Sequence, residues 1–157
     1  MELYSLLDRL HIDYEECGHG PVFTMEDVEK EKIGEKIKGR ECKVLFVKHK
    51  KRYYLVLLPA EKRADLKAIA EAAGEPKLSF AGEDHLFELL NLRPGAVTPL
   101  ALIYDKEKKV KLITDASLKG ERILMHPCVN TKTIAMKYED LLVFVRETGH
   151  EYMETEG

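Results

Sequence analysis

Lys43 stands out because it carries a positive charge within an otherwise apolar segment, residues 42–47. Side chains alternate along a strand, so Lys43 shares a face with Leu45 and Val47. If that face is buried, the ammonium group must lie in a pocket or meet a partner, because a bare buried charge is costly. The alternative is a lysine at a strand entrance whose ammonium group reaches water.

A second candidate is the loop Gly95-Ala96-Val97-Thr98-Pro99. Its glycine permits close approach of another backbone or a ligand. A loop of this kind can direct N–H groups at a carbonyl oxygen or a phosphate. The alternative is a plain connector between a helix and a strand.

A third candidate is the segment from His126 to Thr133, which is dense in hydrogen-bonding side chains, including Asn130. Such a cluster can also simply satisfy the backbone of a loop. His126 and Cys128 supply two possible metal ligands, whereas structural zinc needs four. We therefore predict no metal site and no cofactor.

Two familiar catalytic motifs are incomplete or absent in this sequence. Gly34 and Gly39 have the spacing of a phosphate-binding loop, but Arg40 and Glu41 follow where Lys and Ser or Thr are required. No G-x-S-x-G segment is present, so a hydrolase nucleophile elbow is excluded. Whatever chemistry the chain performs therefore relies on other groups.

Composition describes an ordinary globular chain, with 157 residues, 45% apolar, 34% charged and a net charge of -3. We expect one domain over residues 1–157. Residues 30–52 nevertheless contain ten Lys or Arg and three Glu, a basic segment that could steer an anionic ligand or simply be solvated.

The compartment is suggested by the cysteines and by the start of the chain. Three widely spaced cysteines suit reduced thiols in the cytoplasm. The first residues show no signal peptide, and the longest apolar run, residues 53–60, is too short to cross a membrane. We expect a cytoplasmic protein without a membrane partner.

The elements that must position the three candidate segments follow from hydrophobic periodicity and turn residues. Helices are expected near residues 3–10, from the Thr24 capping box onward, and over 65–73, 83–90 and 139–148. Strands are expected near residues 12–15, 42–48, 52–58, 78–80, 100–104, 110–114, 122–125 and 133–137, with a short strand closing the chain. Residues 100–104 and 110–114 should form a hairpin. This order predicts an α/β fold with a mixed, largely antiparallel sheet and surrounding helices.

Five segments, in this order, resemble the YbaK/prolyl-tRNA-synthetase-associated family, and within it the free-standing PrdX-like deacylases. They are Pro21-Val22-Phe23-Thr24, Lys43-x-Leu45-Phe46, Leu78-Ser79-Phe80-Ala81, Pro94-Gly95-x-Val97-x-Pro99 and His126-Pro127-x-x-Asn130-Thr131. The resemblance runs from the first helix to Gly149 and implies a curved central sheet.

The resemblance also implies roles for individual residues. Lys43 corresponds to the key lysine of the family, Gly95 and Pro99 bracket its substrate loop, and His126 corresponds to a histidine at the pocket edge. The family often has Asn after the lysine, where this chain has Val44. The departure bears on the choice of substrate more than on the type of reaction.

The reaction implied is hydrolysis of the ester between an amino acid and the terminal ribose of tRNA. This ester is already activated, so positioning and charge stabilisation can suffice without a protein nucleophile. We expect N–H groups from Gly95 to Thr98 to polarise the carbonyl and Lys43 to hold the substrate, while a hydroxyl of the substrate assists water. Lys43 as a general base is a variant that requires a strongly lowered pKa.

Selectivity should come from a small apolar pocket with Leu45 and Val97 as walls, which refuses the proline ring and admits alanine. The expected substrate is therefore Ala-tRNA(Pro), bound by its acceptor end, with Pro-tRNA(Pro) spared. Cysteinyl or seryl esters, another small aminoacyl ester, and a non-catalytic tRNA- or synthetase-binding module are the alternatives. Prolyl-tRNA synthetase is a candidate partner.

Overall fold

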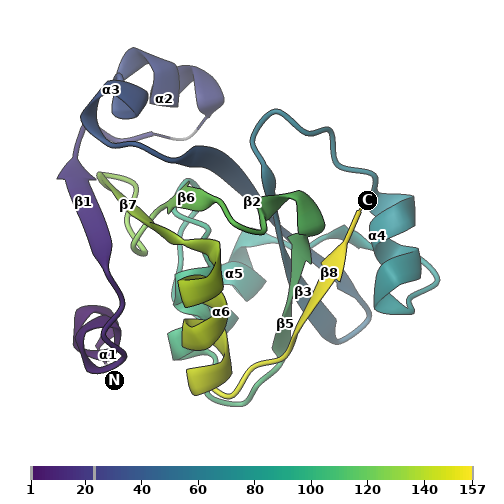
Figure 1. Cartoon of the computed structure of the whole chain (residues 1–157). Helices are drawn as coiled ribbons and strands as arrows, with labels where there is room; N and C mark the ends of the chain where they lie inside the picture. The colour runs from purple at the N-terminus through teal and green to yellow at the C-terminus, as the bar shows by residue number, and fades with distance from the viewer. Residues whose placement is uncertain (1, 23, 157) are drawn as a thin grey trace.

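The computed structural model describes residues 2–22 and 24–156. Met1, Phe23 and Gly157 lie outside the described residues, and Phe23 belongs to one of the family segments quoted above. Within the described residues, eight strands form one open sheet in the order β1-β7-β6-β2-β3-β5-β8, with β4 paired to β2 (Figure 1). The strands are β1 (Tyr14–Gly18), β2 (Arg40–His49), β3 (Arg52–Pro59), β4 (Ser79–Phe80), β5 (Val110–Asp115), β6 (Arg122–Met125), β7 (Lys132–Lys137) and β8 (Tyr152–Thr155).

The sheet is mixed, as predicted. Four of the described pairings are antiparallel, namely β1–β7, β6–β7, β2–β3 and β2–β4. The pairings β2–β6, β3–β5 and β5–β8 are parallel. The expectation of one domain over residues 1–157 stays a prediction, and it is supported by a sheet that takes strands from both ends of the chain.

Strand β2 joins the two halves of the sheet. It pairs with β6 only through Arg40 and Glu41, and from Cys42 onward it pairs with β3. Figure 1 shows β2 as a long strand that runs from the β6–β7 side to the β3–β5 side. Lys43 therefore lies just beyond the point where β2 leaves one neighbour and joins the next.

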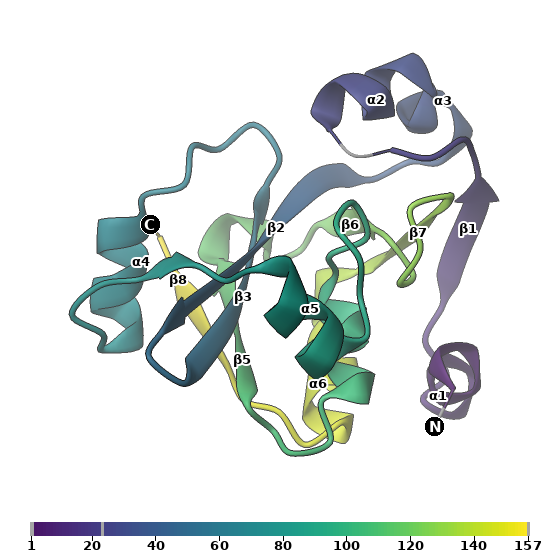
Figure 2. The same cartoon turned by 180° about the vertical axis from the view of Figure 1, so that it is seen from behind.

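The helices cover different parts of the sheet. In both views α2 (Met25–Lys30) and α3 (Ile33–Lys36) lie near β1, β7 and β6, whereas α4 (Leu66–Ala73) lies at the β3–β5–β8 end (Figures 1 and 2). The main core packs side chains of α1 (Leu3–Arg9), α5 (Glu83–Leu90) and α6 (Tyr138–Glu147) against the sheet. In the part of the chain that the structure describes, no helix has the length and apolar character needed to span a membrane.

Local signals in the sequence explain several helix ends. The predicted capping box is present: the Thr24 hydroxyl accepts from the Asp27 backbone N–H at 3.1 Å, and the Asp27 carboxylate accepts from the Thr24 N–H at 3.3 Å. Gly74, with φ of 73°, ends α4, because a left-handed backbone costs glycine little.

The predicted hairpin of residues 100–104 and 110–114 is wrong. The first of these segments belongs to a 3₁₀ helix, η1 (Pro99–Tyr104), and β5 instead pairs in parallel with β3 and β8. Thr98 caps η1 and Pro99 begins it, a position where proline needs no N–H partner. Leu100, Ala101 and Leu102 are all buried, so this apolar run reflects burial on every side rather than strand alternation.

Candidate active site

A cavity of about 240 Å³ opens where β2 leaves β6. Apolar side chains form most of its wall: Val22, Val28, Ile33, Val44, Val97, Leu124 and Met125. The other lining residues are Thr24, Glu41, Cys42, Lys43, Gly95, His126 and Thr133. The cavity therefore brings together Lys43, Gly95, Val97 and His126, which are far apart in the sequence.

Lys43 lines this cavity, in agreement with the pocket alternative. Glu41 pairs in register with Leu124 of β6, and Leu124 packs on the face covered by α3. Alternation along β2 places Lys43 on the same face as Glu41. The backbone of Lys43 pairs with Leu58 of β3, but its side chain makes no hydrogen bond or ion pair with the described residues. Its ammonium group is therefore left available for an anionic or carbonyl oxygen.

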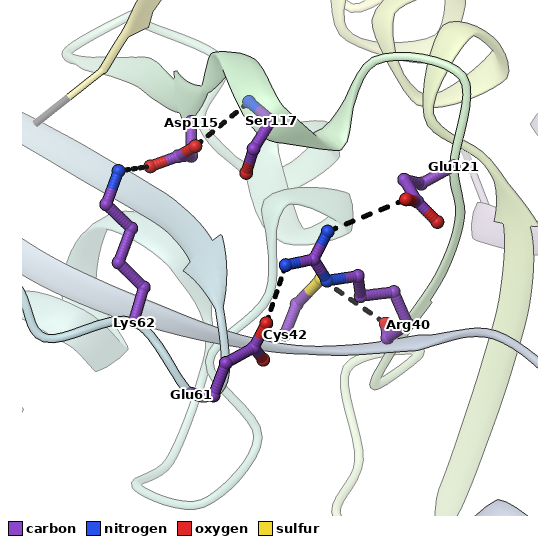
Figure 3. A network of polar contacts seen from close by, with 7 residues as sticks. All are labelled: Arg40, Cys42, Glu61, Lys62, Asp115, Ser117 and Glu121. Carbon is purple, nitrogen blue, oxygen red and sulfur yellow. Dashed lines mark hydrogen bonds and ion pairs between the residues drawn. The ribbon is translucent and has the colours of Figure 1, made fainter.

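Figure 3 shows a polar network that includes Cys42, a residue of the cavity wall, whose thiol donates to the Arg40 carbonyl oxygen at 3.5 Å. Arg40 donates to Glu61 at 2.6 Å and lies 3.5 Å from Glu121. The pKa of Glu61 is lowered, chiefly by the hydrogen bond from Arg40, with smaller contributions that include the charge of Lys43. Arg40 thus forms an ion pair with Glu61, the carboxylate that also interacts electrostatically with Lys43.

The loop from Gly95 to Val97 offers backbone donors. Gly95 has φ of 92°, a conformation that side chains disfavour and glycine accepts. The Ala96 N–H donates to Arg93 at 3.3 Å, whereas the N–H groups of Gly95 and Val97 donate to none of the described residues. Two free donors in one short loop at a cavity wall suit a carbonyl oxygen that gains negative charge.

Thr98 and Pro99 follow this loop and anchor its end at the start of η1. The Thr98 side chain is fully buried and accepts from the Leu100 N–H at 3.3 Å, and Pro99 is buried at the start of η1. Neither residue is among those that line the cavity. Their side chains anchor the loop, and the catalytic role expected for Thr98 and the substrate-binding role expected for Pro99 stay predictions.

His126 lies at the cavity with a defined orientation. Its Nδ1 is 2.9 Å from the Lys132 carbonyl oxygen, which can only accept, so Nδ1 carries the proton and Nε2 of the neutral ring is an acceptor. Burial is the main reason why the pKa of His126 is lowered below its ordinary 6.5. The ring is therefore neutral at pH 7.

His19 was missed by the sequence reasoning. Its ring centroid is 6.2 Å from that of His126, and its Nε2 is 2.8 Å from the hydroxyl of Thr133, another cavity residue. Its Nδ1 is 2.7 Å from the Gly20 carbonyl oxygen and so donates to it, which leaves Nε2 to accept from Thr133. His19 thereby fixes the Thr133 hydroxyl at the cavity wall.

Leu45 and Asn130, which the sequence analysis expects to contact the substrate, are not among the described residues that line the cavity. Leu45 packs with Val47, Ile69 and other members of a second core cluster, because α4 covers that stretch of β2. It is not part of the cavity wall. The Asn130 side chain donates to the Val22 carbonyl at 3.2 Å, and the Val22 N–H donates back to Asn130 at 3.2 Å. Asn130 thus positions a wall residue and does not face the cavity.

Covalent and metal chemistry find little support in the side chains present. Burial raises the pKa of the Cys42 thiol, and that of Cys128, to about 12, so neither is a thiolate at neutral pH. Within residues 2–22 and 24–156, no three His, Cys, Asp or Glu side chains gather closely enough to hold a metal ion. The polar groups at the cavity include a lysine, two backbone donors, a neutral histidine, a carboxylate and threonine hydroxyls.

Residues 19–144 match the model of the aminoacyl-tRNA editing domain. The chain belongs to this family. It is 35% identical over 156 residues to the prolyl-tRNA editing protein ProX of Acetoanaerobium sticklandii, covering 96% of this chain and 92% of the relative. It is 34% identical to the mouse prolyl-tRNA synthetase associated domain-containing protein 1, covering 96% and 91%.

A solved structure supports the fold. The crystal structure of a proposed trans-editing enzyme for prolyl tRNA synthetase superposes with a TM-score of 0.72 at 19% identity, covering 99% of this chain and 94% of the other. At that identity the match speaks for the fold alone. The mixed α/β fold expected from the sequence is thus confirmed, and so is the family.

Proposed function

We propose that this editing domain hydrolyses the ester of mischarged tRNA(Pro), with Ala-tRNA(Pro) as its main substrate and Pro-tRNA(Pro) spared. The observation that carries the proposal is the cavity itself, in which Lys43 without a partner lies with the free N–H groups of Gly95 and Val97. The similarity to a relative named prolyl-tRNA editing protein supports the choice of tRNA.

The proposed reaction needs no protein nucleophile. The N–H groups of Gly95 and Val97 donate hydrogen bonds to the ester carbonyl oxygen and stabilise the negative charge that develops on it when water attacks. Lys43 holds the substrate through the phosphate of the terminal nucleotide or through the carbonyl oxygen. The neighbouring hydroxyl of the terminal ribose assists the attacking water, and the ester bond breaks to release the free amino acid and tRNA.

The proposal assigns selectivity to the apolar walls of the cavity. About 240 Å³ is smaller than a typical ligand pocket of roughly 300–1,000 Å³, so it suits the aminoacyl end and not a whole nucleotide. Val97, Val44 and Ile33 are apolar walls against which a proline ring would clash and a methyl group would fit. A second site that excludes the larger cognate residue corrects errors that binding to a synthetase leaves.

Hydrolysis of Ala-, Cys-, Ser- and Pro-tRNA(Pro) by the parent and by Lys43→Ala tests the proposal. We expect loss of the alanyl ester, survival of the prolyl ester, and no reaction with the variant. Lys48→Ala is the matched control, because Lys48 lies on β2 outside the cavity. If the parent binds tRNA(Pro) and leaves all four esters intact, the protein is a binding module instead.

The finer partners belong to the same proposal. The acceptor end of tRNA is the substrate, and prolyl-tRNA synthetase, named in several relatives, is the candidate partner that would hand it over. Because mischarged tRNA arises where translation occurs, the proposal includes a cytoplasmic protein. Preference for cysteinyl or seryl esters is the alternative outcome of the same assay, and Val44 is the residue that would explain it.

A further inference from the structure

Glu41 is the acidic residue among the described residues that line the cavity. It is half-buried, and its side chain makes no hydrogen bond or ion pair with the described residues. Its backbone is fixed, because its carbonyl oxygen accepts from the Ala60 N–H at 2.9 Å. The proposed hydrolysis gives the Glu41 carboxylate no role.

The position of Glu41 relative to Lys43 is set by the strand. The two residues are two apart on β2, so their side chains leave the same face about 7 Å apart. The nearby guanidinium of Arg40 is already engaged by Glu61 and Glu121. A negative and a positive group therefore flank the same part of the cavity without neutralising each other or being neutralised by Arg40.

An aminoacyl ester carries an α-ammonium group one carbon away from its ester carbonyl. Moving that charge into a mostly apolar cavity is unfavourable unless a carboxylate or several acceptors meet it. Lys43 repels a cation, and the N–H groups of Gly95 and Val97 are donors. Glu41 is the cavity group with the matching charge.

We infer that Glu41 binds the α-ammonium group of the aminoacyl ester and so places the ester carbonyl at Lys43 and the Gly95–Val97 loop. This inference rests on the proposed hydrolysis of aminoacyl-tRNA and adds the group that recognises the amino acid as such. Its consequence is that the enzyme acts poorly on esters whose nitrogen is missing or acylated.

The test compares two esters on tRNA(Pro): alanyl, and lactyl, which carries a hydroxyl in place of the ammonium group. Glu41→Gln keeps the shape of the side chain and removes its charge. We expect kcat/KM of this variant on the alanyl ester to fall roughly 10- to 100-fold, the value of one charged hydrogen bond. Its activity on the lactyl ester should equal that of the parent.

Glu35→Gln is the control for net charge, because Glu35 is exposed on α3 outside the cavity. It should hydrolyse the alanyl ester like the parent. Retained lactyl hydrolysis by Glu41→Gln shows that the variant is folded. Full alanyl activity of Glu41→Gln, or an equal loss on both esters, overturns the inference while leaving the proposed function standing. A parent that hydrolyses neither ester overturns both.

Discussion

The two ends of the sheet differ in whether their charged side chains have hydrogen-bond partners. At the β3–β5–β8 end, the buried carboxylate of Glu75 accepts two hydrogen bonds from Arg52, both at 2.7 Å, and one from Tyr54 at 2.5 Å. At the cavity, Lys43 and Glu41 meet no described partner. Paired groups of this kind stabilise a fold, and unpaired ones that face a cavity are available to a ligand.

The same contrast holds for a second buried cluster. His150 Nε2 lies 2.9 Å from the Asp105 carboxylate, and its Nδ1 lies 2.9 Å from the Thr148 hydroxyl. Asp105 also accepts from the N–H groups of Lys109 and Val110. This chain of Thr, His and Asp has the residue types of a catalytic triad, yet it is buried and satisfied, and it joins the end of α6 to the turn before β5.

The largest effect should come from removing the unpaired lysine. Lys43→Ala should lower kcat/KM for the alanyl ester by about 100- to 1,000-fold, the loss typical for one group that stabilises transition-state charge. Its melting temperature should stay near that of the parent, because Lys43 has no described partner to lose. A large drop in melting temperature with activity intact would mean that Lys43 stabilises the fold and does not act on the substrate.

The opposite result is expected at the paired end. Glu75→Gln removes one partner of a buried charged network and should lower the free energy of unfolding by about 3 kcal/mol. Urea unfolding measures this loss. Alanyl-ester hydrolysis at 25 °C should be unchanged, since Glu75 lies outside the cavity. Lost activity in a variant that is still folded would show that the two regions are coupled.

The same carboxylate predicts a dependence on pH. The hydrogen bonds from Arg52 lower the pKa of Glu75 from 4.5 to about 2. A lowered pKa means that the unfolded chain takes up the proton first, so this contribution to stability is complete above pH 4.5 and is lost as pH falls toward 2. Unfolding of the parent and of Glu75→Gln, measured from pH 5 to pH 2, should show a steeper loss for the parent.

The ion pair between Arg40 and Glu61 tests whether Lys43 must stay unpaired for full activity. Arg40→Gln frees Glu61, whose charge already reaches Lys43, to pair with that lysine. Exposed ion pairs are worth about 0–1 kcal/mol, so activity should fall by no more than roughly fivefold. The double variant Arg40→Gln with Glu61→Gln should recover it. Absence of recovery would mean that Arg40 acts through the strand and not through the carboxylate.

The smallest effect concerns His126. Its pKa is lowered by burial, so its neutral form favours folding above pH 6.5 and this contribution is lost as pH falls below 6.5. Replacing it in His126→Gln should flatten the pH dependence of stability in that window. Chemical unfolding at pH 7.5 and pH 5.5 measures the difference, and an unchanged slope would assign the titration to another group.

Features that depend on residues close together in the sequence were predicted best. The capping box at Thr24, the end of α4 at Gly74 and the bounds of α5 depend on neighbouring residues, and all three were found from the sequence. Lys43 was found for the same reason, since a charge in an apolar strand is visible locally. The Gly95 loop and the His126 segment were also candidates from their residue types. The family resemblance then assigned roles to Lys43, Gly95 and His126, which line the same cavity.

What the sequence did not reveal depends on which element covers which face. Alternation correctly placed Lys43 and Leu45 on one face of β2, but α3 covers that face near Lys43 and α4 covers it near Leu45. Only the first stretch borders the cavity. Val28 and Ile33 were missed because the small helices that carry them reach the cavity through tertiary packing.

The short hairpin turn at the far end of β2 fixes the register of this strand and so the side chains that β2 presents to the cavity. His49 pairs with Arg52, so Lys50 and Lys51 alone make the turn, with Lys50 at φ of 56°. One added residue there would slide β2 by one position and rotate every side chain to the opposite face. Lys43 would then turn out of the cavity. The length of a surface turn six residues along the strand thus decides which side chains of β2 face the cavity.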